Sequence, residues 1–121
     1  MNYWTLVGTF RNWMIGILYG IWGVSKKAKS IWNKIQPGDR VVFYAVKTGI
    51  LGTGTVECKF ESKELLFPEE REEGELKWPF RLKIRVEKVF EDSKERPGNM
   101  LVTLSINELD SETFRVITGN P

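Results

Sequence analysis

The segment GIWGVSKKAKS, residues 20–30, places a tryptophan directly before a cluster of lysines. Trp22 is followed within seven residues by Lys26, Lys27 and Lys29. A flat indole can stack on a nucleobase, which contributes about 1–3 kcal/mol per base, and lysines can bind the phosphates of the same nucleotide. These residue types at this spacing favour a site for nucleic acid.

Each of these features also has a purely structural interpretation. A tryptophan is most often a packing residue, and lysines on a helix are usually its solvated face. We expect Gly20 and Gly23, which lack side chains, to leave one face of the Trp22 indole open. The chain also has five tryptophans in 121 residues, more than a core of this size needs. Trp78 precedes Pro79 where a long loop meets a strand, so it is expected to flank the same pocket.

The composition excludes several kinds of chemistry. The chain has no histidine and one cysteine, Cys58. This excludes a Ser-His-Asp triad, a Cys-His pair, the commonest zinc sites and an internal disulfide. The run of glutamates within residues 69–75 lacks the spacing of a calcium loop and predicts a solvated loop. No metal and no cofactor is expected, and binding is favoured over catalysis.

Charge is distributed unevenly, although the net charge is only +2. Residues 1–60 contain eight Lys and Arg against two Asp and Glu, whereas residues 61–121 contain ten against fourteen. The basic half suits an anionic partner such as nucleic acid. No apolar run approaches the roughly 20 residues of a membrane-spanning helix, and the start lacks the pattern of a signal peptide. A cytoplasmic protein without a membrane partner is therefore expected.

The N-terminal third predicts a strand followed by two helices. Residues 2–8 are apolar and end in glycine, which is typical of a strand. Asn12 is expected to cap a helix that runs to about residue 20. Ser25 is expected to cap a second helix that ends near Ile35 and exposes its lysines.

The remainder predicts mainly strands. Residues 40–46 read as a central strand, and the glycines of residues 50–60 predict bulges or a sharp bend. Residues 61–77 are expected to be irregular. In the strand at residues 80–86, Phe80, Leu82, Ile84 and Val86 should face inward, and Arg81, Lys83 and Arg85 outward. A last strand at residues 100–106 and a short helix at residues 109–117, capped by Asp110 or Ser111, complete an α+β fold. Helices flank a small β-barrel in a single domain, residues 1–121.

Four segments resemble the EVE domain family, which belongs to the PUA-like group and is related to YTH domains. They are NYWTLVGTFRNW, GIWGVSKKAKSIWNKIQPGDRVVFYAV, GTGTVECKF and WPFRLKIRVEKV, and together they span most of residues 2–90. The resemblance implies a PUA-like β-barrel flanked by short helices. It also implies a pocket that accepts a modified base in RNA or DNA.

The resemblance further implies roles for individual residues. Trp22 is similar to the first wall of the methyl-base cage in YTH relatives, and Trp78 is the best candidate for the second wall. Asn12 stands where relatives place a polar residue that hydrogen-bonds the base, and Thr9 and Ser25 are weaker candidates nearby. The residues expected to bind phosphate are Arg11, Lys26, Lys27 and Lys29.

The charge around Trp22 bears on the ligand. No Asp or Glu lies within sixteen residues of Trp22 on either side, so the sequence favours a neutral methylated base over a cationic ligand. Burying a methyl group against aromatic walls contributes about 0.8 kcal/mol.

Three functional hypotheses remain open. A non-catalytic reader of modified bases, monomeric or weakly homodimeric, is favoured. The alternatives are a nucleotide-acting enzyme that uses Lys or Glu, and an interaction subunit that buries Trp22 and Trp78 in a homodimer.

Overall fold

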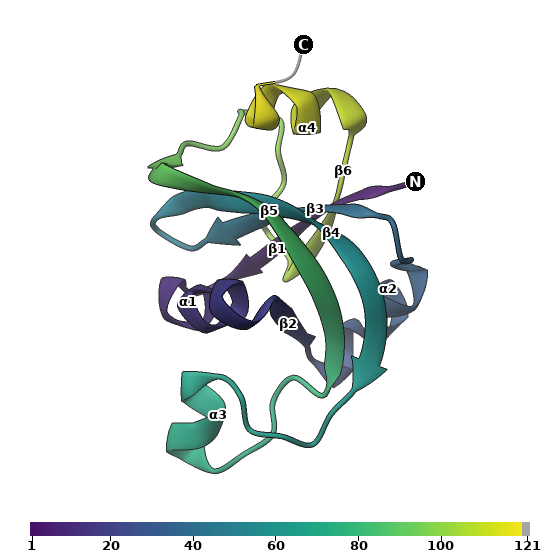
Figure 1. Cartoon of the computed structure of the whole chain (residues 1–121), viewed down its shortest axis with the longest axis vertical. Coiled ribbons are helices and arrows are strands. Elements are labelled where there is room, and N and C mark those ends of the chain that lie inside the picture. The colour runs from purple at the N-terminus through teal and green to yellow at the C-terminus, as the bar shows by residue number, and fades with distance from the viewer. Residues whose placement is uncertain (120–121) are drawn as a thin grey trace.

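The computed structural model describes residues 1–119, in which one six-stranded sheet is accompanied by four short helices (Figure 1). The strands are β1 (Tyr3–Gly8), β2 (Ile21–Val24), β3 (Arg40–Ala45), β4 (Gly49–Glu61), β5 (Phe80–Lys94) and β6 (Ile106–Leu109). The helices are α1 (Phe10–Tyr19), α2 (Lys29–Lys34), α3 (Pro68–Glu73) and α4 (Ser111–Thr118), and a 3₁₀ turn at Lys26–Ala28 precedes α2. The predicted α+β class is confirmed.

The sheet is a bent half-barrel with two free edges. Its strand order is β2-β5-β4-β3-β1-β6, and only the pair β1–β3 is parallel. The pairing of β4 with β5 shifts register at three places, between Ile50 and Gly52, between Thr53 and Gly54, and between Val56 and Cys58. These shifts confirm the bulges that the glycines predicted, because an extra residue bends and twists a strand. β2 and β6 are the two edge strands.

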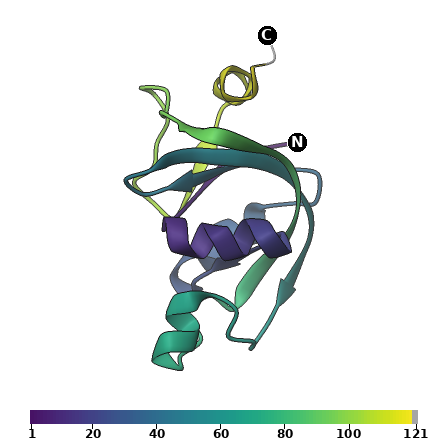
Figure 2. The ribbon, with the colours of Figure 1, turned by 60° about the vertical axis from the view of Figure 1, so that its left-hand side comes forward.

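Both faces of the sheet are covered, and β3 shows how. Val41 and Phe43 alternate with Val42 along this strand. The first two belong to the main core together with Trp13 of α1, whereas Val42 packs in a smaller cluster with Phe114 of α4. Figure 2 shows α1 within the curve of the sheet and α4 on its outer side. The hollow side of the half-barrel is therefore filled from α1.

The first two helices begin at residues other than those predicted. Thr9 caps α1, because its Oγ1 accepts the backbone N–H of Asn12 at 3.2 Å. Asn12 therefore lies one turn inside the helix. Ser25 precedes the 3₁₀ turn, but its side chain makes no capping hydrogen bond, and α2 begins only at Lys29. The predicted exposure of the lysines in this region is confirmed.

The acidic segment is more ordered than predicted. It contains α3 in place of a solvated loop, and Glu70 of this helix is completely buried. Arg81 was expected to face solvent, but its side chain is 1% exposed. The segment at residues 62–79 covers this position and supplies partners for the guanidinium, which alternation along a strand cannot reveal.

The strand predicted at residues 100–106 is wrong except at its last residue. Residues 100–105 are irregular, and β6 begins at Ile106. The Asn107 amide accepts the backbone N–H of Leu104 at 3.3 Å and donates to its carbonyl at 2.7 Å. Such local side-chain bonds compete with a sheet ladder. The terminal helix is confirmed, with Asp110 as its cap.

None of the helices within residues 1–119 has the length and apolarity that crossing a membrane requires.

Candidate functional site

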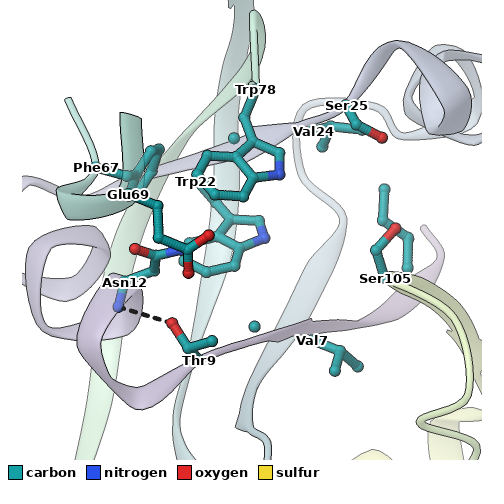
Figure 3. A pocket seen from close by; sticks show the side chains of 13 residues that line it. Val7, Thr9, Asn12, Trp22, Val24, Ser25, Phe67, Glu69, Trp78 and Ser105 are labelled. Atoms are coloured by element: carbon teal, nitrogen blue, oxygen red, sulfur yellow. Dashed lines mark hydrogen bonds between the residues drawn. The ribbon is translucent and has the colours of Figure 1, made fainter. Parts of the chain in front are cut away.

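A pocket of about 190 Å³ lies between the two free edges of the half-barrel (Figure 3). β2 forms one side, and the end of β1 with the start of β6 forms another. The start of α1 and the segment around α3 complete the lining. It includes all five residues predicted to bind the base, namely Thr9, Asn12, Trp22, Ser25 and Trp78. The fold thus brings them together, and their roles in binding stay predictions.

Trp22 is both a pocket residue and a core residue. Its side chain is 6% exposed. Its ring stacks on Trp13 at a centroid distance of 3.7 Å and an interplanar angle of 4°. Trp13 in turn donates its indole N–H to the carbonyl of Tyr44 at 3.0 Å, which fixes this pair against β3. One face of the Trp22 indole is therefore covered by the protein.

The glycines that make room for Trp22 are not the two that flank it. A Cβ atom added at Gly8 would lie 2.4 Å from the Trp22 ring, and one at Gly16 would lie 2.9 Å from it. Gly20 instead ends α1 with a φ of 66°, a left-handed conformation that suits glycine. The sequence interpretation assigned the space around the Trp22 ring to the wrong glycines. Close contact with Trp22 comes from β1 and α1.

Gly23 has a different role, because its lack of a side chain lets Trp78 and Phe67 pack closely against β2. A Cβ atom there would lie 2.5 Å from the Cβ of Trp78 and 2.9 Å from the ring of Phe67. Phe67 contacts Trp22 and Trp78 edge-on, at centroid distances of 5.5 and 5.6 Å. Within residues 1–119, no direct ring contact joins Trp22 to Trp78. Three aromatic rings therefore line the pocket, and Phe67 contacts both indoles from the side.

A buried ion pair holds this aromatic wall in place. The Glu70 carboxylate accepts backbone N–H groups on both sides of the segment, at 3.0–3.1 Å. These donors belong to Leu66, Phe67, Lys77 and Trp78. Arg81 lies 3.3 Å from the same carboxylate and also donates to the carbonyl of Trp78. Burial lowers the pKa of Arg81, and the neighbouring carboxylates oppose that shift.

Asn12 is a lining residue of the pocket. Its side chain is 4% exposed, and its Oδ1 has no hydrogen-bond partner among residues 1–119. A buried acceptor without a partner costs about 1–3 kcal/mol. The sequence predicted a polar contact from this residue, and the structure places its side chain in the lining.

Glu69 is a pocket residue that the sequence analysis missed. It is half-buried, and its carboxylate lies beside Asn12 in the view of Figure 3. Among the interactions of the described residues, Glu69 has no side-chain hydrogen bond and no ion pair. The argument that no acid lies near Trp22 holds along the sequence and is wrong in space. A separation of 47 positions gives no local signal.

Phe67, Val7 and Ser105 also line the pocket without having been predicted. Phe67 had a weak signal, since it is an aromatic residue next to Pro68 in an otherwise acidic segment. Val7 and Ser105 had none. They meet because β1 and β6 are neighbours, where the Val7 N–H donates to the Ser105 carbonyl at 2.9 Å.

Three of the predicted phosphate-binding lysines come shortly after a pocket residue along the chain. Lys26, Lys27 and Lys29 are exposed and come directly after Ser25, which is in the lining. Lys29 also lies 5.0 Å from the centre of the Phe80 ring. We call Lys26, Lys27 and Lys29 the lysine cluster.

Arg11 is less suited to phosphate binding than the sequence suggested. Its guanidinium donates to both carboxylate oxygens of Glu72, at 2.6 and 2.8 Å. This hydrogen-bonded pairing raises the pKa of Arg11 and lowers that of Glu72. A phosphate would have to compete with this carboxylate.

The model of the EVE domain family matches residues 2–119. The chain belongs to the EVE domain family. A UPF0310 protein from Pyrococcus abyssi is 23% identical to this EVE chain, with 97% of each chain covered. A UPF0310 protein from Pyrococcus horikoshii is 36% identical over 44 residues, which are 36% of this chain and 30% of the relative.

Solved structures place this EVE chain in the expected fold group. A protein from Pseudomonas putida has a TM-score of 0.62 at 15% identity, with 97% of each chain covered. The Mmi1 YTH domain has a TM-score of 0.56 at 18% identity, covering 97% of this chain and 69% of that chain. A structure of the Mmi1 YTH domain in complex with RNA has a TM-score of 0.55 at 22% identity, covering 73% and 53%. The predicted PUA-like fold is confirmed.

Proposed function

We propose that this EVE domain binds RNA or DNA and accepts one modified base, methylated in particular, in the pocket between Trp22 and Trp78. The observation that carries the proposal is the combination of aromatic walls with the polar side chains of Asn12 and Glu69 in one cavity. A pocket that reads a single base needs flat apolar walls for stacking and a few polar atoms for its edge. Both are present here.

The physical chemistry favours a modified base over a plain one. A base that leaves its stack to enter a pocket loses stacking energy, which the aromatic walls of the pocket return at about 1–3 kcal/mol per base. A methyl group adds apolar surface against Trp22, Phe67 or Trp78, worth about 0.8 kcal/mol when fully buried. The side-chain amide of Asn12 hydrogen-bonds the base edge. The site therefore recognises both shape and hydrogen-bonding pattern.

The lysine cluster supplies the sequence-independent part of the affinity. Lysines next to the pocket neutralise phosphates of the strand and release counterions, which makes binding sensitive to salt. The RNA complex of the Mmi1 YTH domain supports a nucleic-acid ligand for this fold. We propose binding without catalysis, because the lining contains one carboxylate and no histidine to activate its hydroxyl groups.

Tryptophan fluorescence titrated with oligonucleotides tests the proposal. Short RNA and DNA strands with one modified base should quench the emission saturably, and the matching plain strands should bind more weakly. Trp78→Ala should abolish this discrimination, whereas Tyr19→Ala, an exposed aromatic outside the pocket, should leave it intact. Equal affinity for modified and plain strands would contradict base reading.

The same fluorescence measurement distinguishes the homodimer hypothesis from base binding. Burial of Trp22 and Trp78 by a second copy would change the emission with protein concentration in the absence of any oligonucleotide. Sedimentation velocity over the same concentrations measures the association directly. We expect a monomer or a weak dimer whose pocket stays accessible.

A further inference from the structure

The polar side of the pocket includes the side chains of Asn12 and Glu69. Asn12 contributes its side-chain amide. Glu69 contributes a half-buried carboxylate that has no ion pair within residues 1–119. Figure 3 shows both side chains on the same side of the pocket, next to the Trp22 ring. A ligand that fits here must present hydrogen-bond donors to this side.

We propose that the pocket selects a methylated purine that carries a positive charge and donates two N–H groups from its edge, the chemistry of 7-methylguanine. The inference rests on the proposed function and specifies its ligand. It replaces the neutral base that the sequence favoured, because the fold places Glu69 in the pocket.

The donor pattern favours guanine among the bases. Guanine carries N1–H and the N2 amino group side by side, and a carboxylate accepts such a pair with its two oxygens. Adenine and cytosine place a ring acceptor beside their amino group, and that acceptor would face the carboxylate without a proton between them. Leaving a polar group unpaired in a buried site is costly. Glu69 therefore disfavours those two bases unless they are themselves protonated or cationic.

Methylation at N7 adds a charge that the aromatic walls can use. The positive charge spreads over the ring system, and cations are attracted to the faces of tryptophan and phenylalanine. Trp22, Phe67 and Trp78 supply these faces, and Glu69 is the negative charge that balances the ligand. Neutral guanine would keep the edge contacts and lose both charge terms.

A methylated lysine side chain would also be attracted to aromatic rings and a carboxylate. Two features favour the base. A trimethylammonium group has no N–H to donate to the Glu69 carboxylate. The lysine cluster beside the pocket repels a basic peptide and attracts the phosphate of a nucleotide.

The experiment compares four nucleotides as quenchers of tryptophan fluorescence, slightly below neutral pH so that N1 of the methylated guanine keeps its proton. The probes are 7-methylguanosine, guanosine, N6-methyladenosine and 5-methylcytidine 5′-monophosphates. We expect 7-methylguanosine monophosphate to bind at least tenfold more tightly than guanosine monophosphate. Glu69→Gln should weaken its binding by roughly tenfold to a hundredfold, the usual loss for a hydrogen bond to a charged group.

Glu75→Gln is the matched control, since Glu75 is exposed and lies outside the pocket lining. It makes the same change of charge and should leave all four affinities within about twofold. Glu69→Gln should leave the neutral methylated nucleotides unaffected or bound more tightly. Preference of the wild type for a neutral methylated base, or equal loss in the two variants, would overturn the inference while keeping the proposed function.

Two further outcomes would also overturn it. If no nucleotide and no modified oligonucleotide quenches the fluorescence, the proposed function itself fails. If a trimethyl-lysine peptide quenches saturably and 7-methylguanosine monophosphate does not, the pocket binds an ammonium group instead.

Discussion

At the scale of single residues, Trp22 combines two roles that the sequence presented as alternatives. Its ring is stacked on Trp13 in the core, and it also lines the pocket. A wall that is part of the core is rigid, so little conformational freedom is lost when a base stacks against it. Truncation of this residue must then affect folding and binding together.

We predict that Trp22→Ala lowers the free energy of unfolding by about 3–5 kcal/mol, the usual cost of truncating a large core aromatic. Urea denaturation followed by circular dichroism measures this. The sequence argument for an open indole predicts a smaller loss, so a change below about 1 kcal/mol would contradict the stacked position. Trp78→Ala, at a half-buried position, should cost clearly less stability while removing base selectivity.

The contact of Gly8 with Trp22 gives a second prediction at this scale. Gly8→Ala places a methyl group 2.4 Å from the indole, so the ring must move. We expect a loss of about 1–3 kcal/mol in stability, typical of overpacking, together with weaker base binding. Gly98→Ala is the control, because a Cβ atom there has no neighbour within 4 Å. Equal stability of the two variants would show that the Trp22 ring is not fixed.

At the scale of elements, the pocket depends on a segment that the sequence suggests is solvated. Residues 62–79 carry Phe67 and Trp78, and the buried Glu70 carboxylate binds backbone N–H groups near both ends of the segment. One carboxylate thus replaces the sheet or helix contacts that usually order a chain. Arg81 of β5 connects this assembly to the sheet.

We predict that Glu70→Ala lowers stability by about 3–5 kcal/mol, because it leaves the Arg81 charge without its carboxylate partner and removes the acceptor of four backbone N–H groups. Hydrogen exchange should accelerate in residues 62–79 before it does in β3 and β4. Glu75→Ala, at an exposed position, is the control and should leave both measurements nearly unchanged. Uniform acceleration over the whole chain would contradict a local role.

At the scale of the whole molecule, acid should destabilise the fold through Asp39. Burial opposes ionisation of this carboxyl group, yet backbone N–H groups of Asn2 and Gln36 and the indole N–H of Trp4 donate to it. The hydrogen bonds prevail, and the pKa of Asp39 is lower than its usual value. These bonds attach the start of β1 to the turn before β3.

The sign of the pH dependence follows from this lowered pKa. The stabilisation by Asp39 is fully present above the pKa that this carboxyl group has in the unfolded chain, about 3.9. It is lost as the pH falls through the lower pKa that Asp39 has in the folded chain. Unfolding free energies measured from neutral to strongly acidic pH should therefore fall more steeply in the wild type than in Asp39→Asn. Asp92→Asn, at an exposed position, should follow the wild type; parallel curves for wild type and Asp39→Asn would contradict the prediction.

The proposed binding of nucleic acid also depends on charges spread over the surface. Lys26→Glu combined with Lys29→Glu should weaken oligonucleotide binding for every base and should reduce its salt dependence, because fewer counterions are released. Lys47→Glu combined with Arg115→Glu makes the same change of net charge outside the lysine cluster. Filter binding at several salt concentrations measures the affinity and the salt dependence of both double variants. Affinity that does not respond to salt would contradict phosphate contacts.

Local patterns predicted much of the fold and part of the pocket lining. They predicted β1, β3, β4 and β5, but they missed β2, which lies between the two predicted helices, and they misplaced β6. The glycines of residues 50–60 predicted the bulges that bend β4. The segment around Trp22 predicted one pocket wall. Glu69 and Phe67 could not be placed, since their position depends on the buried Glu70 carboxylate, and a glutamate inside an acidic run looks solvated.

The pairing of β1 has a consequence for the order in which the protein is made. β1 leaves the ribosome before the other five described strands, and one of its two neighbours, β6, begins only at Ile106. Most of the chain must be synthesised before Ser105 can complete the pocket, and contacts between residues so distant in sequence form slowly. A nascent chain halted before residue 105 therefore exposes β1 as an open edge that other chains can pair with. The pocket is therefore complete only when translation of the domain is nearly finished.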